Sequence, residues 1–171
     1  MGNYIFNRSN NLDFKMSNGG LTVFLTVLGL SGTLLANTKK EKELILWLME
    51  HDIEVRGLGN GGFDVEDMPW DETNFEMEKE FLMKVVMGAK SRVGWDSLDY
   101  APNEELVRAN LDNFIELVRI LEPENINKNA YDEWINEENV DPRFKNPKGY
   151  PKCEKHGIFL YWNGCIACND I

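Results

Sequence analysis

Apolar residues recur at helical spacing in three segments, and each segment begins with residues that cap helices. Thr38 with Glu41 and Thr73 with Glu76 have the spacing of a capping box, and Pro102-Asn103 opens the third segment. The apolar faces that follow are Leu44, Ile45 and Leu48; Phe75, Phe81, Leu82, Val85, Val86 and Ala89; and Val107, Leu111, Phe114, Ile115, Val118 and Leu121. We predict one helix from 38 to about 51, one opening at 73, and one that Glu122-Pro123 stops.

Two other segments have the composition of strands. Residues 21–28 are rich in β-branched and aromatic side chains, and Ser31-Gly32 favours a turn before a second short strand at 33–35. Residues 53–55 and 63–65 alternate apolar and charged side chains around the glycine-rich stretch 57–62, which predicts a hairpin. The fold class predicted is α+β: a small antiparallel sheet with about three helices packed on it, plus a C-terminal zinc-bound knuckle.

Two segments invite other interpretations. The glycine-rich stretch 57–62 lacks the Gly-Lys-Ser/Thr of a nucleotide-binding loop and lies between two predicted strands, so its composition favours a turn. The apolar run from 21 to 35 resembles the core of a signal peptide, but it contains Thr, Ser and Gly and is short for a membrane helix. We expect it to be buried strand, with no membrane contact.

Composition and charge divide the chain into three parts. A length of 171 residues suits one ordinary core plus an appendage. We predict an acidic α+β domain at 1–122, a connection at 123–152 with four of the six prolines and a short helix near 131–136, and a zinc-binding tail at 153–171. The net charge is −11, and residues 64–141 alone carry −14 while 142–171 carry +3.

The tail contains the most specific chemical pattern in the chain. All three cysteines and one of the two histidines lie there, as Cys153, His156, Cys165 and Cys168, in two pairs with two residues inside each pair. Four soft donors in this spacing suit tetrahedral Zn2+ in a closed, structural site. The alternative is a redox pair at Cys165 and Cys168, but the matching spacing of Cys153 and His156 favours metal. Three cysteines cannot all pair as disulfides, so we expect a reducing compartment, the cytoplasm.

The residues that surround these ligands resemble a known class of motif. Cys153, His156, Gly157, Phe159, Gly164, Cys165 and Cys168 follow the pattern C-x2-H-G-x-[FY]…G-C-x2-C. This resembles small zinc fingers of zinc-ribbon or treble-clef type found in phage and mobile-element proteins, helicase loaders and nuclease-associated modules. The resemblance covers about twenty residues and implies a bound metal without implying a particular function.

The acidic middle of the chain favours a basic protein partner. Its charge opposes contact with a phosphate backbone over the main domain. The candidate partner-binding carboxylates are Asp64, Glu66, Asp67, Asp71, Glu72, Asp96 and Asp99. The alternative is that acidic helix faces only keep the protein soluble. A further alternative is nucleic-acid binding, which the charge of the middle region opposes. The residues that could support it lie near the tail: Lys145, Lys148, Lys152 and Lys155 with Tyr150, Tyr161 and Trp162.

No catalytic arrangement is predicted. The second histidine, His51, falls at a helix end, where its common role is to contact the last carbonyls. The close carboxylate pairs are what twenty-nine acidic residues produce by chance. We therefore predict a non-enzymatic interaction module. A small acidic α+β domain with a zinc tail is similar in type to immunity proteins that neutralise bacterial toxins, many of which are basic nucleases; the alternative is a phage or mobile-element zinc finger.

Overall fold

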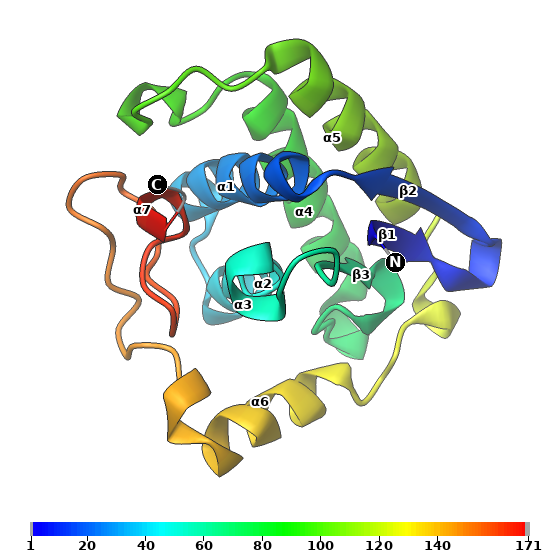
Figure 1. Cartoon of the computed structure of the whole chain (residues 1–171). Helices are drawn as coiled ribbons and strands as arrows, with labels where there is room; N and C mark the ends of the chain where they lie inside the picture. The colour runs from blue at the N-terminus through cyan, green and yellow to red at the C-terminus, as the bar shows by residue number, and fades with distance from the viewer. Residues whose placement is uncertain (1, 170–171) are drawn as a thin grey trace.

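A single buried helix, α1 (Asn18–Leu35), forms the centre of the protein. The computed structural model describes residues 2–169, apart from the side chains of residues 138 and 139. Ser17 caps α1 by accepting a hydrogen bond from the Gly20 N–H at 3.0 Å. Helices α2, α4, α5 and α7 pack around it (Figure 1). Because α1 contacts protein on nearly every side, its apolar residues show no single stripe.

The predicted strand pair at 21–35 is therefore wrong. The small residues that suggested a turn are instead points of close helix packing. A Cβ on Gly32 would lie 2.3 Å from Cδ1 of Ile45 on α2, so only glycine lets the two helices approach this closely. By length and composition α1 also meets the criteria for a membrane span, and 67% of that span is buried inside the protein.

The three predicted helices are all present. α2 (Lys39–Met49) begins with the predicted capping box, in which Thr38 and Glu41 bond reciprocally. α5 (Glu104–Arg119) is capped by Asn103, which accepts a hydrogen bond from the Leu106 N–H. α4 (Phe75–Lys90) follows a 3-10 turn at Glu72–Asn74, and Asp71 caps that turn; the capping box predicted at Thr73 and Glu76 does not form.

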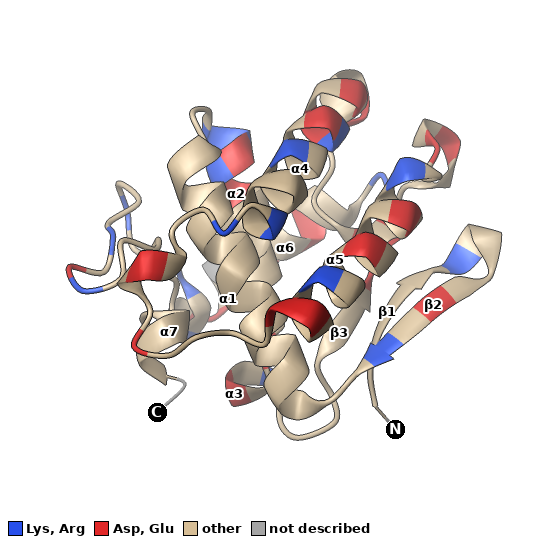
Figure 2. Cartoon of the chain, turned by 90° about the horizontal axis from the view of Figure 1, so that it is seen from above, with Lys and Arg blue, Asp and Glu red and all other residues tan. Residues whose placement is uncertain are grey.

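The sheet is built from other strands than those predicted. β1 (Asn3–Asn7) pairs antiparallel with β2 (Leu12–Met16) and parallel with β3 (Gly62–Asp64), in the order β2-β1-β3. The hairpin predicted at 53–65 is wrong, because α3 (Ile53–Arg56) is helical and ends at Gly57 with φ +89°. β3 pairs with the N-terminal strand, so the sheet is mixed, and it lies at the edge of the molecule (Figure 2).

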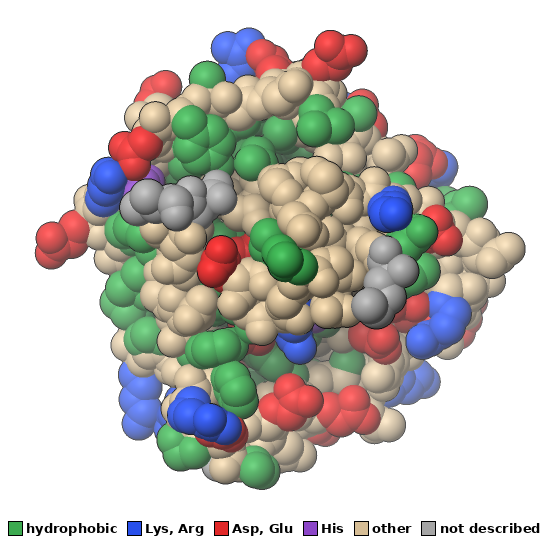
Figure 3. Space-filling model, in the orientation of Figure 1, with side chains coloured by type: hydrophobic (Ala, Val, Ile, Leu, Met, Phe, Trp, Pro, Cys, Tyr) green, Lys and Arg blue, Asp and Glu red, His purple; other side chains and the backbone are tan. Residues whose placement is uncertain are grey.

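The predicted short helix near 131–136 is confirmed and is longer, as α6 (Ala130–Val140). It runs along the lower edge of the view in Figure 1, where acidic side chains gather on the surface in Figure 3. The chain ends in a short helix, α7 (Ile166–Asn169). Over the described residues the three-stranded mixed sheet and seven α-helices confirm the α+β class.

Gly62 provides a test of the β1–β3 pairing. Its φ is +99°, and a Cβ would lie 2.1 Å from the backbone oxygen of Tyr4 on β1. We expect Gly62→Ala to lower the free energy of unfolding by about 3 kcal/mol, measured by urea denaturation. Gly19→Ala is the matched control because nothing lies within 4 Å of its Cβ position in α1, and we expect a change within about 1 kcal/mol. Equal stability of the two variants would contradict the parallel pairing.

Candidate metal centre

Two tight backbone turns place the four predicted ligands in the C-terminal segment 152–169, called here the finger. In the first turn the Gly157 N–H donates to Cys153 O and the Cys153 N–H donates to Ile158 O, both at 2.8 Å, with Gly157 at φ +69°. An isolated antiparallel bridge joins Tyr161 to Gly164, and Cys165 then precedes α7, which contains Cys168. The first pair thus comes from a knuckle, and the second comes from the residue before a short helix and from the helix itself.

The four side chains converge to a separation that suits a metal ion. The three Sγ atoms and one His156 nitrogen all lie within 4.8 Å of one another. His156 Nδ1 is 3.3 Å from Cys168 Sγ and 3.6 Å from Cys153 Sγ and Cys165 Sγ. Ligands around a tetrahedral zinc ion are separated by roughly 3.3 to 3.8 Å, given Zn–S and Zn–N bonds of about 2.3 and 2.0 Å. The cluster is therefore compatible with zinc, as the spacing in the sequence predicted.

The three thiols differ in the direction in which the protein shifts their pKa. Burial raises the pKa of Cys165 to about 12 and also raises the pKa of Cys168. Burial acts in the same direction on Cys153, but hydrogen bonds, first from the backbone N–H of His156, outweigh it and lower the pKa of Cys153 to about 6. Metal coordination requires thiolates, so binding to this cluster is coupled to proton release.

Asp99 lies against the outer side of the histidine ligand. Its Oδ2 is 3.6 Å from His156 Nε2 and 2.7 Å from Lys155 Nζ. Because Nδ1 faces the cysteines, Nε2 faces the carboxylate, an arrangement that fixes ring orientation at metal sites. The neighbouring loop also holds the finger, since Ser97 Oγ donates to His156 O at 3.0 Å. Sequence reasoning placed Asp99 in a partner surface and missed this contact, because no local pattern links two residues so far apart in the chain.

The finger shares the central core of the protein. Ile158 and Ile166 are fully buried, and the Phe159 N–H donates to Thr33 Oγ1 on α1 at 3.2 Å. His156 and Cys165 are only 4% and 5% exposed. Four protein ligands in a buried site fit a structural metal, because a catalytic zinc keeps one position for water or substrate.

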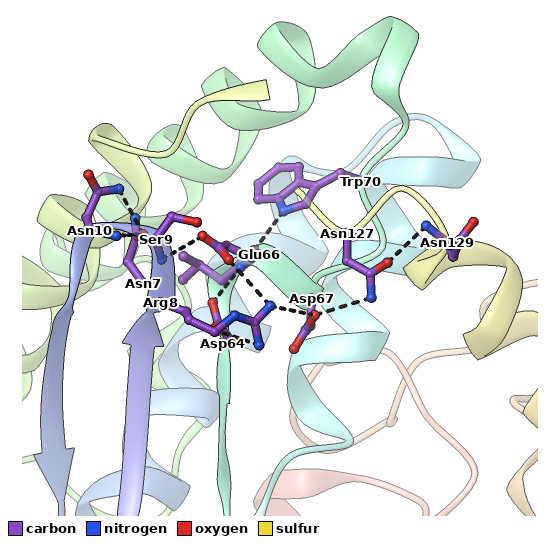
Figure 4. Close-up of polar contacts among 11 residues, drawn as sticks. Asn7, Arg8, Ser9, Asn10, Asp64, Glu66, Asp67, Trp70, Asn127 and Asn129 are labelled. Atoms are coloured by element: carbon purple, nitrogen blue, oxygen red, sulfur yellow. Dashed lines mark hydrogen bonds and ion pairs between the residues drawn. The ribbon is translucent and has the colours of Figure 1, made fainter. Parts of the chain in front are cut away.

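Three of the predicted partner-binding carboxylates surround one arginine (Figure 4). The Arg8 guanidinium lies 3.7 Å from Asp64, 3.4 Å from Glu66 and 3.8 Å from Asp67. Glu66 is 2% exposed and accepts a hydrogen bond from the Ser9 N–H at 3.0 Å, so it holds the turn between β1 and β2. Asp67 is the most exposed of the three.

The other four predicted carboxylates are divided between two places. Asp71 accepts hydrogen bonds from Thr73 and Asn74, and Glu72 pairs with Lys128 at 2.9 Å, both near the start of α4. Asp96 is exposed, in the same loop as Asp99 beside the finger. The structure thus brings together Asp64, Glu66 and Asp67 but separates them from Asp96 and Asp99.

His51 occupies the helix end that the sequence indicated. Its Nδ1 lies 2.8 Å from Trp47 O in the last turn of α2. Burial lowers the pKa of His51 to about 3, and the ring packs on Trp47 and Phe63. A neutral, packed imidazole of this kind serves the core.

Metal content tests the assignment of the four ligands. Purified protein should contain one equivalent of zinc, and His156→Ala or Cys165→Ser should lower this content at least tenfold, because three ligands remain. Elemental analysis after gel filtration measures the stoichiometry. His51→Gln is the control, since it changes the other histidine and should leave one zinc per chain. Equal metal content in the His51 and His156 variants would contradict the site.

Zinc affinity tests the role of Asp99. Asp99→Asn should keep one zinc per chain and weaken zinc affinity by about tenfold. Loss of a carboxylate that contacts a metal ligand typically weakens metal affinity by about 10- to 100-fold, and we expect the smaller effect because Asp99 is exposed. Competition with a chromophoric chelator measures the affinity. Asp96→Asn, in the same loop, is the matched control and should leave it unchanged.

Comparison of the chain with protein-family models, curated proteins and solved structures gave no significant match.

Proposed function

We propose that this chain is a non-enzymatic interaction protein that binds a basic protein partner, as immunity and inhibitor proteins do. Its proposed compartment is the cytoplasm, and its proposed metal is a structural zinc ion. A closed set of three sulfurs and one nitrogen supports zinc, because soft donors in tetrahedral spacing select it over Mg2+ or Ca2+.

The open face of the sheet is the observation that carries the partner proposal. Strand register places Asp13, Phe6 and Asp64 in one row across the three strands. Phe6 is 40% exposed and stacks on Tyr4, with ring centroids 5.6 Å apart. These side chains line a surface hollow of about 560 Å3 that also includes Asp67.

The opposite face of the sheet is covered by the rest of the protein, so only one face is open to a partner. Ile5 and Asn7 point inward, and the Asn7 side chain donates to Leu117 O on α5 at 2.8 Å. The outward row therefore combines exposed aromatic surface with carboxylates on both sides of it. Two cations, Arg8 and Lys15, lie on this face, and Lys15 Nζ is 5.7 Å from the centroid of the Tyr4 ring. They balance only two of the four carboxylates Asp13, Asp64, Glu66 and Asp67, so the surface attracts a further cation.

The charge distribution supports a protein partner of basic character. The chain carries −11 overall, which accelerates encounter with a basic surface and opposes encounter with nucleic acid. Aromatic side chains at the centre of a charged rim are also typical of protein interfaces.

One observation favours the second candidate, a finger that contacts nucleic acid. Lys145 and Lys148 are exposed beside the finger, and Lys152 is exposed at its start. Lys155 is exposed as well but pairs with Asp99. This footprint is small against the negative charge of the rest of the chain.

The test uses a basic candidate partner recovered from the native host by pull-down. Asp13→Lys with Asp67→Lys should weaken binding at least tenfold, about 1.4 kcal/mol, and lower the association rate, because both charges face the partner. Biolayer interferometry at two salt concentrations measures both quantities. Glu105→Lys with Glu124→Lys is the matched control, because these exposed carboxylates lie outside the sheet.

Binding that is indifferent to salt and to the Asp13 and Asp67 reversals would overturn the proposal. A gel shift with DNA at low salt that Lys152→Glu abolishes would support the finger as a nucleic-acid contact instead.

A further inference from the structure

A cavity lies between α3, α6 and the finger. Its volume is about 720 Å3, within the range of small-molecule sites. Four separate segments form it: residues 50–56 at the end of α2 and in α3, helix α6, the turn after α6, and the finger. It is distinct from the sheet face, and its use does not depend on the partner proposed above.

Aromatic side chains form one wall of this cavity. Phe144 and Trp162 pack edge to face with ring centroids 4.6 Å apart. Trp134 adds a third ring, and its Nε1 donates to Glu50 Oε2 at 2.8 Å, which fixes the orientation of the indole. Val55 and Val140 complete the apolar part of the lining. The Phe144 ring already holds one cation, since the guanidinium carbon of Arg143 lies 5.5 Å from its centroid. Rings held in this way can offer their π faces to a cation without further ordering.

Carboxylates form the rest of the lining. Glu50, Glu133 and Glu137 reach the cavity, and Glu50 is 5% exposed. A fourth acid, Asp141, is bonded by the guanidinium of Arg143. Among the described residues of the lining, Arg56 is the only basic one, and its Nε donates to Glu50 O at 3.0 Å. The charge of the cavity is therefore negative, and acidic side chains next to hydrophobic ones are visible over α6 in Figure 3.

We propose that this cavity binds an organic cation, an ammonium or guanidinium group attached to an apolar body. The aromatic wall attracts such a cation through its π electrons, and the carboxylates attract it by charge in a partly desolvated site. The volume exceeds what a single metal ion needs. Among the described residues the group with metal-ligand spacing is the Cys/His cluster of the finger.

The finger holds part of this cavity in place. Trp162 lies between the two ligand pairs, and its backbone N–H donates to Asn146 Oδ1 at 2.9 Å. Asn146 Nδ2 in turn donates to Glu50 Oε1 at 3.1 Å. One chain of contacts thus links the metal-binding turns, the aromatic wall and the buried carboxylate. A metal ion held by the four ligands would therefore act on the cavity by fixing the turn that contains Trp162.

Matched pairs of probes test the chemistry and its source. The first pair is choline and its uncharged analogue 3,3-dimethylbutan-1-ol, which represents a free small molecule. The second is a short arginine-containing peptide and its citrulline counterpart, which represents a protein side chain. Tryptophan fluorescence and calorimetry should show saturable 1:1 binding of at least one charged probe, at least tenfold tighter than its neutral analogue. Equal binding within both pairs, or no binding at millimolar concentration, would overturn the proposal.

Variants then place the bound probe in the cavity. Glu50→Gln should weaken binding of the charged probe at least tenfold. Glu133→Gln should also weaken binding, and because Glu133 is exposed this substitution leaves folding intact. Glu105→Gln on α5 is the control and should bind as the parent does. The paired reversals of Asp13 and Asp67 should also leave this affinity unchanged, which separates this site from the sheet face. Unchanged affinity in both the Glu50 and Glu133 variants would overturn the assignment.

Discussion

The burial of α1 on nearly every side is the constraint on which the rest of the structure depends. A helix with no solvent-facing stripe must find a partner for each polar side chain it carries, because an unpaired buried hydroxyl is costly. Thr22 donates to Asp52 at 2.6 Å, Thr26 to Thr22 O at 2.7 Å, and Ser31 to Val85 O on α4 at 2.7 Å. Thr33 accepts from the Phe159 N–H of the finger. These bonds connect α1 to the N-terminus of α3, to α4 and to the finger.

Close approach to α1 also decides where glycine occurs. Gly29 faces Met49 of α2 and Ile158 of the finger, and Gly88 of α4 faces Ser31, where a Cβ would lie 2.3 Å from Oγ. Glycine in a helix costs about 1 kcal/mol relative to alanine, and the close packing at these positions explains why glycine occurs there. The same glycines and hydroxyls that make the sequence of 21–35 look like strand and turn are what allow three elements to pack on one helix.

The sequence predicted features that depend on local chemistry. Capping at Thr38 and at Asn103, the apolar faces of α2, α4 and α5, and the four metal ligands all follow from spacing within a few residues. It did not predict the sheet, because β1 turns polar Asn3 and Asn7 inward, where they bond to Met16 O and Leu117 O. Nor did it reveal the links from Asp99 to His156 or from Asn146 to Glu50, which join residues 57 and 96 positions apart.

The position of the finger would give a metal bound there a wider structural role than stabilising a tail. The finger inserts Ile158, Phe159 and Ile166 into the core that α1 organises, and it turns Trp162 outward toward α6. A segment of this length cannot build a core of its own, so its shape follows from the ligand cluster on one side and from Thr33 on the other. Any change at the ligands is therefore transmitted in two directions, into the packing of α1 and into the wall of the cavity beside Glu50.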